Sequence, residues 1–194
     1  MSPFARASAV VFDLDGTLTA PYLDFDRIRS EIGLEPGPIL EGIAGLDRPA
    51  RAAAESILLR HEWEAAENAI LRDGAMDVMT ALRARGHPTA IVTRNARLTV
   101  HRVLDRFGLT VDAIRTRDDG PIKPSGEPIL SICDELGADP KAGWMVGDYL
   151  FDILAGREAG SKTALIIGDG PPPRYAAQAD HVIRQLAELL PLIS

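Results

Sequence analysis

The sequence predicts an α/β fold in which helices cover both faces of a parallel sheet. Short runs of apolar and β-branched residues recur along the chain, and helical patterns follow most of them. Strands that alternate with helices are typical of parallel sheets, because the connection between two parallel strands has to cross over the sheet. One long segment without a strand follows the first run, which indicates a helical insertion.

Five segments have the length and composition of buried strands. They are SAVVF at 8–12, PTAIVT at 88–93, VDAIRT at 111–116, GWMVG at 143–147 and TALIIG at 163–168. Three helical patterns between them end on Gly86, Gly108 and Gly137, and glycine is the residue that most often follows a helix. Asn95 is a candidate N-cap for the helix that ends at Gly108.

Residues 20–73 contain no convincing strand, although a crossover needs far fewer residues. The stretch 48–74 has apolar residues at helical spacing, and shorter helical patterns near 24–33 and 38–46 offer it apolar partners. One stripe carries Ala54, Ile57, Leu58, Ala65 and Ala69, and the next carries Leu59, Trp63, Ala66 and Ile70. We expect these helices to form a small module beside the sheet.

Composition and charge limit the partners of the chain. The 194 residues are enough to bury a sizeable core, and the formal net charge is −7. No large basic field attracts phosphodiesters, so we expect no nucleic-acid partner. Residues 1–8 lack a charged segment followed by a long apolar run, and no window approaches the roughly 18 apolar residues of a membrane helix. We therefore expect a cytoplasmic protein without a membrane partner, and the sequence indicates no oligomeric state.

Polar side chains follow the predicted strands. They are Asp13 and Asp15 after the first strand, Thr93 after the second, Lys123 in the loop after the third, and Asp148 with Asp152 after the fourth. Ligands of open parallel sheets bind beyond the carboxyl ends of the strands, so these residues would converge on one crevice. Two unit charges about 4 Å apart cost roughly 4 kcal/mol at an effective dielectric constant of about 20. One lysine does not balance four carboxylates, and an all-oxygen donor set favours Mg²⁺ over Zn²⁺.

Each motif also has a structural reading of its own. An aspartate at a strand end is usually a turn or cap residue, and Thr93 can simply finish a strand. The order of the motifs, each of which follows a strand, favours a functional site over separate turns. That ordered set, DLDGT, VTRN, KPSGEP and GDYLFD, resembles the four motifs of the haloacid dehalogenase superfamily over nearly the whole chain.

The resemblance implies a Rossmann-like catalytic core formed by residues 1–19 and 74–194. Residues 20–73 look like the small α-helical cap of phosphoglycolate-phosphatase-like members. The activity implied is that of a Mg²⁺-dependent phosphatase, which hydrolyses a small phosphorylated metabolite through an aspartyl phosphate. Asp13 would be the nucleophile and a metal ligand. Asp15 would be the general acid and base, with its backbone carbonyl on the metal.

The remaining motif residues would hold the phosphoryl group and the ion. By the same resemblance, Thr93 and the backbone amide of Arg94 would hold phosphoryl oxygens, and Lys123 would neutralise charge. Asp148 would be a direct metal ligand. Asp152 would act in the outer shell of the metal through water.

Three other functions share parts of this pattern. A phosphosugar mutase would carry the same core motifs and differ in holding the intermediate against water. A phospho-accepting signalling domain, from a different class, also combines aspartates with a threonine and a lysine, and a catalytically silent binding module is a further alternative. A dehalogenase would not need Asp15. Phosphonatase-like chemistry needs a cap lysine, and the lysines of this chain are Lys123, Lys141 and Lys162.

The cap would select the substrate. Its polar candidates are Tyr22, Arg27, Arg48, Arg51 and His61, which read equally well as surface or helix-face residues. Residues 20–73 carry 11 acidic residues against 6 arginines, which argues against a bulky polyanion as substrate. Which phosphorylated metabolite is hydrolysed stays open at this point.

Overall fold

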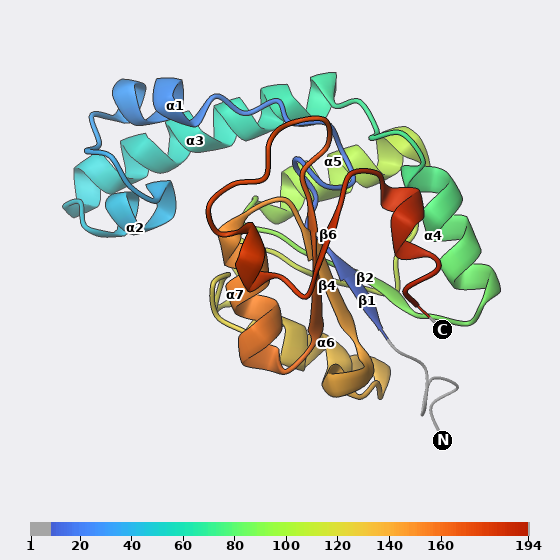
Figure 1. Ribbon diagram of the computed structural model, residues 1–194. Helices are drawn as coiled ribbons and strands as arrows, with labels where there is room; N and C mark the ends of the chain where they lie inside the picture. The colour runs from blue at the N-terminus through green and yellow to red at the C-terminus, as the bar shows by residue number, and fades with distance from the viewer. Residues whose placement is uncertain (1–8, 194) are drawn as a thin grey trace.

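A computed structural model describes residues 9–193 (Figure 1). Its sheet contains six strands, all parallel, in the order β3-β2-β1-β4-β5-β6, which confirms the predicted α/β fold. Ser8, the first residue of the first predicted strand, and residues 1–7 lie outside the described residues. β1 has β2 on one side and β4 on the other, so the strand order reverses direction at β1.

The elements follow one another in the expected alternation. The strands are β1 (Val10–Phe12), β2 (Thr89–Val92), β3 (Ala113–Arg115), β4 (Trp144–Gly147), β5 (Lys162–Ile166) and β6 (His181–Ile183). The α-helices are α1 (Phe25–Ile32), α2 (Ile39–Ala44), α3 (Arg48–Asn68), α4 (Ala75–Ala84), α5 (Arg97–Phe107), α6 (Glu127–Leu136) and α7 (Leu150–Ala159). Short 3₁₀ turns are η1 (Arg117–Asp119), η2 (Pro140–Ala142), η3 (Ala176–Gln178) and η4 (Leu186–Leu189).

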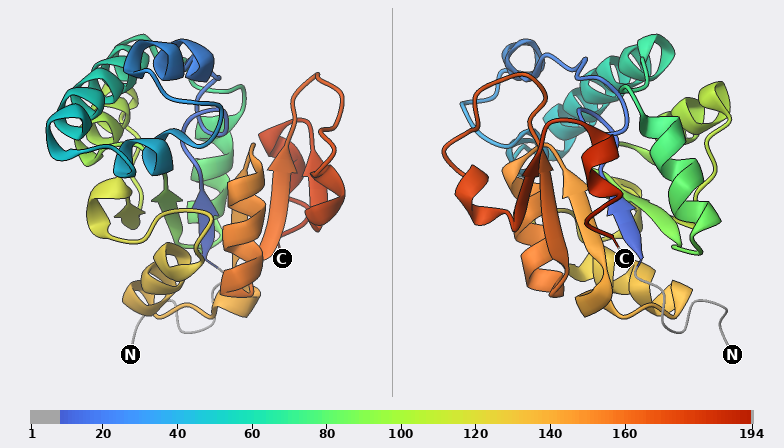
Figure 2. Two further views of the ribbon diagram at one scale, coloured as in Figure 1. Left: turned by 90° about the vertical axis from the view of Figure 1, so that its left-hand side faces the viewer. Right: turned by 45° about the vertical axis from the view of Figure 1, so that its right-hand side comes forward.

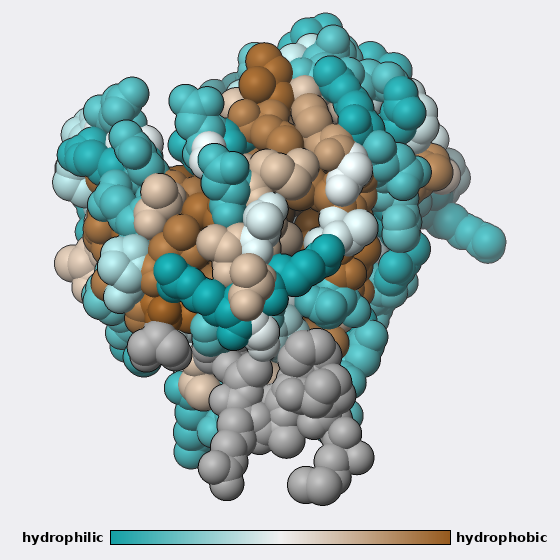
Figure 3. Space-filling view, turned by 90° about the vertical axis from the view of Figure 1, so that its right-hand side faces the viewer, coloured by the Kyte–Doolittle hydropathy of each residue, from teal (hydrophilic) through white to brown (hydrophobic). Residues whose placement is uncertain are grey.

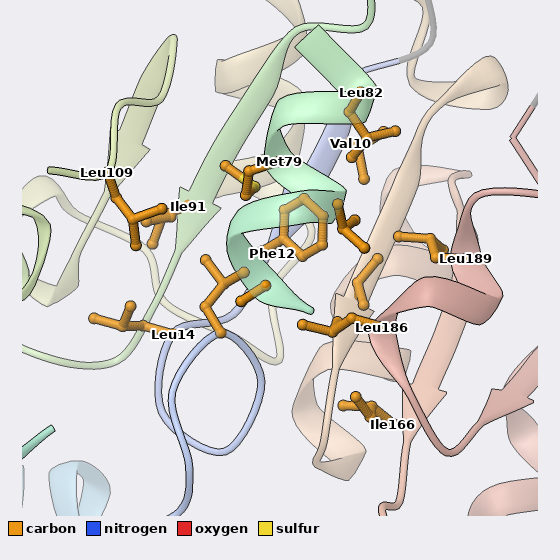
Figure 4. Close-up of a cluster of buried hydrophobic side chains, with 14 of the residues drawn as sticks. Val10, Phe12, Leu14, Met79, Leu82, Ile91, Leu109, Ile166, Leu186 and Leu189 are labelled. Atoms are coloured by element: carbon orange, nitrogen blue, oxygen red, sulfur yellow. The ribbon is translucent and has the colours of Figure 1, made fainter. Parts of the chain in front are cut away.

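Helices cover the sheet on both faces. Successive side chains of a strand point to opposite faces, so Val10 and Phe12 enter a cluster with α4, α5 and η4, while Val11 enters a second cluster with α6 and α7. Figure 4 shows the ring of Phe12 between Met79 of α4 and the leucines of η4. Both faces are buried, which is why the strands read as continuous apolar runs.

The sixth strand was not predicted from the sequence. β6 pairs with β5, with Val182 opposite Leu165, and it forms one edge of the sheet. It has three residues, and Val182 is exposed, so neither its length nor its apolar pattern separates it from the surrounding loops. Pairing with a neighbouring strand creates this element, and local sequence does not encode that pairing.

α1, α2 and α3 lie between β1 and α4 and form a helical insertion with a hydrophobic cluster of its own. Its buried members are Ile28, Ile39, Ile43, Ala54 and Leu58. The Asp24 carboxylate accepts from the Arg27 N–H at 2.9 Å at the start of α1, and Asp47 caps α3 in the same way. The arrows of the sheet point toward this insertion, which lies beyond the carboxyl ends of the strands (Figure 2).

The second predicted stripe of α3 is wrong at Trp63 and Ile70, whereas Ala66 is buried as predicted. α3 ends at Asn68, so Ile70 lies beyond the helix and is 70% exposed, and Trp63 is 38% exposed. His61 and Glu62 are buried instead. His61 and Glu62 are buried because each has a polar partner, and the spacing of apolar residues does not reveal such partners.

One face of the molecule is shown in Figure 3. On the face shown in Figure 3, which lies on the α4 side, hydrophobic residues stand between hydrophilic ones. Within residues 9–193, the structure contains no helix with both the length and the apolar character needed to cross a membrane.

We expect Ile91→Ala to lower the free energy of unfolding by about 2–5 kcal/mol, because Ile91 is fully buried between the sheet and its helices and its truncation leaves a cavity. Leu130→Ala on α6, where the side chain is exposed, should change it by less than about 1 kcal/mol. Urea denaturation of both variants measures the difference. Equal losses would contradict this placement of the core.

Candidate active site

The motif residues lie close together at β1, where the strand order of the sheet reverses. The N–H of Asp13 donates to the Val146 carbonyl oxygen at 2.9 Å, which extends the pairing of β1 with β4 by one residue. On the other side, the Thr93 N–H donates to the Arg115 carbonyl oxygen at 3.0 Å and extends the pairing of β2 with β3. The ends of four strands therefore place their following residues at one rim of the sheet.

Three carboxylates and one lysine form the centre of this rim. Asp13, Asp148 and Asp152 each offer an oxygen atom, and these atoms lie within 4.8 Å of one another. Lys123 is buried, and its Nζ donates to Asp13 Oδ1 at 2.6 Å and to Asp152 Oδ1 at 2.5 Å. The second oxygen of Asp152 accepts from the Tyr149 N–H at 3.0 Å at the start of α7. Both carboxylate oxygens of Asp152 therefore accept hydrogen bonds, whereas Lys123 binds only Oδ1 of Asp13.

Two glycines make room for these carboxylates. Gly16 has φ +81°, and a Cβ atom there would lie 2.2 Å from Asp148 Oδ2. At Gly147, a Cβ atom would lie 2.1 Å from Asp152 Cγ. Any larger residue at either position would displace an acidic side chain of the cluster.

The cluster carries more negative charge than its lysine compensates. Burial, with the charge of Asp13 as the next cause, raises the pKa of Asp148 to about 8. Burial also raises the pKa of Asp152 to about 6, against the opposing effect of Lys123. Although burial opposes it, the pKa of Lys123 is raised by Asp13 and Asp152. A hard divalent cation such as Mg²⁺ fits this all-oxygen set, because it favours the ionised carboxylates.

The side chain of Asp15 is not part of the group of three carboxylates and has hydrogen-bond partners of its own. Asn95 Nδ2 donates to its Oδ2, and the Thr19 hydroxyl donates to its Oδ1 at 3.3 Å. Burial is the main cause that raises the pKa of Asp15, and Asp13 contributes. A raised pKa lets a carboxyl group keep its proton to a higher pH, which suits a proton donor. Asn95 is not the N-cap that the sequence suggested, because the N-cap of α5 is Ala96.

Thr93 and Arg94 complete the motif residues at the site. Thr93 is buried, and its Oγ1 accepts from the Asn95 N–H at 3.3 Å. The Arg94 guanidinium donates to the Lys123 carbonyl oxygen and, at 2.5 Å, to Glu41 on α2. It also lies over the ring of Phe151, 4.8 Å from the ring centre. The side chain of Arg94 therefore joins the helical insertion to the rim.

All seven motif residues line one cavity of about 810 Å³ between the rim and the helical insertion. The seven are Asp13, Asp15, Thr93, Arg94, Lys123, Asp148 and Asp152. Of the five polar candidates from the insertion, Tyr22 lines this cavity, and Arg27, Arg48, Arg51 and His61 do not. His61 is buried against Glu31, with Nε2 at 2.7 Å from the carboxylate.

Glu62 is a residue of this cavity that sequence reasoning missed. Its buried carboxylate accepts from the Ala96 N–H at 3.0 Å and pairs with Arg117 of η1. Glu62 thereby connects α3 of the insertion to the start of α5. Burial raises its pKa to about 7, although Arg117 opposes the shift. The sequence contains one sign of this role. Glu62 follows Leu58 by four residues, so it is a charged residue on the apolar face of the predicted helix.

We expect Glu62→Gln to change the pH dependence of stability. In the wild type the folded-state pKa of about 7 lies above the ordinary 4.5, so ionisation of Glu62 disfavours the folded state increasingly as the pH rises from about 5 to about 8. Over that range, the stability of the wild type should fall relative to the variant by up to about 3 kcal/mol. Gln keeps the acceptor oxygen. Parallel stability profiles in urea denaturation at several pH values would contradict the shift.

Comparison with known proteins identifies the family. The model of the haloacid dehalogenase-like hydrolases matches residues 25–160. An uncharacterized hydrolase of Saccharomyces cerevisiae is 36% identical over 81% of this chain and 76% of its own length. The pyrophosphatase PpaX of Halalkalibacterium halodurans is 30% identical over 96% of both chains.

The solved structures show the same fold. The crystal structure of a predicted phosphoglycolate phosphatase from Haemophilus somnus covers 97% of this chain and 98% of its own, with a TM-score of 0.77 and 21% identity. The family model spans more than two thirds of the chain and includes three of the four motifs. The chain belongs to the haloacid dehalogenase-like hydrolase family.

Proposed function

We propose that this protein is a Mg²⁺-dependent phosphatase that hydrolyses the phosphomonoester of a small metabolite through an aspartyl phosphate at Asp13. The observation that carries the proposal is the cluster of Asp13, Asp148 and Asp152 on Lys123, which opens into the cavity below the helical insertion. The membership in a hydrolase family, and the phosphatase names of its relatives, support the same activity.

In this proposal the ion and the phosphoryl group would bind at the centre of the rim. The carboxylates of Asp13 and Asp148 and the backbone carbonyl of Asp15 would hold Mg²⁺. Asp152 would act in the outer shell, and it also fixes Lys123. Bound Mg²⁺ supplies neutralisation of the charge on the phosphoryl oxygens. The Thr93 hydroxyl, the Arg94 amide and Lys123 hold those oxygens for in-line attack.

Catalysis proceeds in two steps with balanced proton transfer. A carboxylate oxygen of Asp13 bonds to phosphorus, the bond from phosphorus to the ester oxygen breaks, and Asp15 donates its proton to the leaving alkoxide. Asp15 then takes a proton from water, the water oxygen bonds to phosphorus, and the bond to Asp13 breaks to release phosphate. The raised pKa of Asp15 supports its role as the proton donor in the first step.

The helical insertion serves as a cap in this proposal, and the core consists of residues 1–19 and 74–194. Three contacts across the boundary support it. Arg72 donates to the carbonyl oxygens of Gly16 and Thr17, Arg94 pairs with Glu41, and Glu62 pairs with Arg117. These contacts hold the insertion over the rim, where it restricts water and selects the alcohol of the substrate.

We expect Asp13→Asn to lower kcat for p-nitrophenyl phosphate by at least 10³-fold, because the amide oxygen does not replace the carboxylate as nucleophile. Continuous release of p-nitrophenol at saturating Mg²⁺ measures this loss. Asp134→Asn, at an exposed position of α6, is the matched control and should retain activity. Release of p-nitrophenol that stops at one equivalent per wild-type protein, because the phosphoryl group stays on the aspartate, would instead identify a phospho-accepting domain. Ordinary turnover by Asp13→Asn would remove the nucleophile.

Asp15→Asn should act selectively on esters with poor leaving groups. Because an alkoxide needs a proton to depart and p-nitrophenolate does not, we expect a loss of kcat at least tenfold larger for an alkyl phosphate than for p-nitrophenyl phosphate. Steady-state rates on both esters give the ratio. An equal loss on the two esters would argue against Asp15 as the acid.

A further inference from the structure

We propose that the substrate is the monophosphate of an uncharged and largely apolar alcohol, and that Glu41, through its ion pair with Arg94, disfavours substrates with a second anionic group. This inference rests on the proposed phosphatase activity and specifies the substrate class of the same cavity. Two features of the cavity support it: the wall opposite the carboxylates and the partners of the cationic side chains.

The wall of the cavity on the side of the insertion is mainly apolar. The loop before α2 and the first residues of α2 contribute side chains without hydrogen-bond donors: Leu34, Pro36, Pro38, Ile39 and Leu40. Three exposed aromatic side chains also line the cavity, namely Tyr22 at 45%, Phe25 at 52% and Tyr149 at 52%. Single exposed apolar residues are ordinary, but aromatic side chains that gather in the cavity of a reactive cluster are suited to contact a ligand.

Tyr149 belongs to an aromatic group at the edge of the cavity. Its ring meets the ring of Phe151 edge to face, with the centres 5.1 Å apart, and it meets Tyr175 at 5.8 Å. Phe151 lies under the guanidinium of Arg94. This packing holds Tyr149 on the core side of the cavity, while Phe25 comes from α1 of the insertion. An apolar alcohol group attached to the phosphate would lie between Tyr149 and Phe25.

Each cationic side chain that lines this cavity already has anionic or carbonyl partners. Lys123 binds Asp13 and Asp152 at the end where the phosphoryl group reacts. Arg29 pairs with Asp26 and donates to the Gly37 carbonyl oxygen at 3.2 Å.

Arg94 pairs with Glu41 and donates to the Lys123 carbonyl oxygen. A second phosphate or a carboxylate on the substrate would have to displace Glu41 or remain unpaired beside Asp26 and Glu62, which also line the cavity. Unpaired charge in a partly buried site is unfavourable, so the pair of Arg94 with Glu41 selects against doubly anionic substrates.

A panel of esters of primary alcohols tests the substrate class, because their leaving groups are alike. At saturating Mg²⁺, we expect kcat/KM for benzyl phosphate to exceed that for 2-phosphoglycolate and that for glucose 6-phosphate by at least tenfold. An equal or higher value for either of the other two would overturn the inference. Absence of turnover on every ester, p-nitrophenyl phosphate included, would overturn the proposed phosphatase activity itself.

Two variants assign the selectivity to the named residues. Glu41→Gln should raise the ratio of kcat/KM for 2-phosphoglycolate over benzyl phosphate at least fivefold, since Arg94 becomes available to the carboxylate. Glu35→Gln, at an exposed position outside the cavity, is its control and should leave the ratio unchanged. An unchanged or lowered ratio in Glu41→Gln would overturn the role of Glu41.

Phe25→Ala should lower the ratio of kcat/KM for benzyl phosphate over methyl phosphate at least fivefold, because the benzyl group loses its contact on α1. Trp63→Ala is the control, as Trp63 is an exposed aromatic residue of the insertion outside the cavity. Thermal unfolding of each variant verifies that it folds. If Phe25→Ala keeps the wild-type ratio, the apolar wall does not contact the substrate.

Discussion

The repulsion among Asp13, Asp148 and Asp152 is the constraint on which the rest of the site depends. The three carboxylates share a partly buried space, and among the described residues Lys123 is the one cation paired with them, through Asp13 and Asp152. Gly16 and Gly147 allow the acidic side chains to approach, and the order of the strands brings their loops together. Such a cluster is tolerated when a cation and a phosphoryl group use its charge, and this links the architecture of the sheet to the proposed reaction.

Much of the sheet and the motif residues could be predicted from the sequence, because both are recorded in local patterns. Buried parallel strands appear as apolar runs, and the residues that follow them lie at one rim whatever the loops do in detail. β6 was missed because an edge strand of three residues is defined by its pairing with β5. Glu62 and Asn95 were missed because their partners, Ala96, Arg117 and Asp15, lie far away along the chain or belong to another element.

The proposed catalysis and the proposed selectivity lie on opposite walls of one cavity. The core wall carries the polar groups that the chemistry needs, and the wall of the helical insertion is mainly apolar. Arg94 lies where the two walls meet, because its backbone belongs to the rim and its side chain reaches Glu41. In the proposed function, a change in the insertion would alter the choice of alcohol without moving the carboxylates.

The location of a bound divalent cation tests the central claim most directly. Manganese binds the same oxygen ligands as magnesium, so crystals grown with Mn²⁺ and measured at the manganese absorption edge reveal the site by its anomalous signal. The account predicts one strong peak in contact with the carboxylates of Asp13 and Asp148. A peak at another place on the protein, with none between these two side chains, would contradict it.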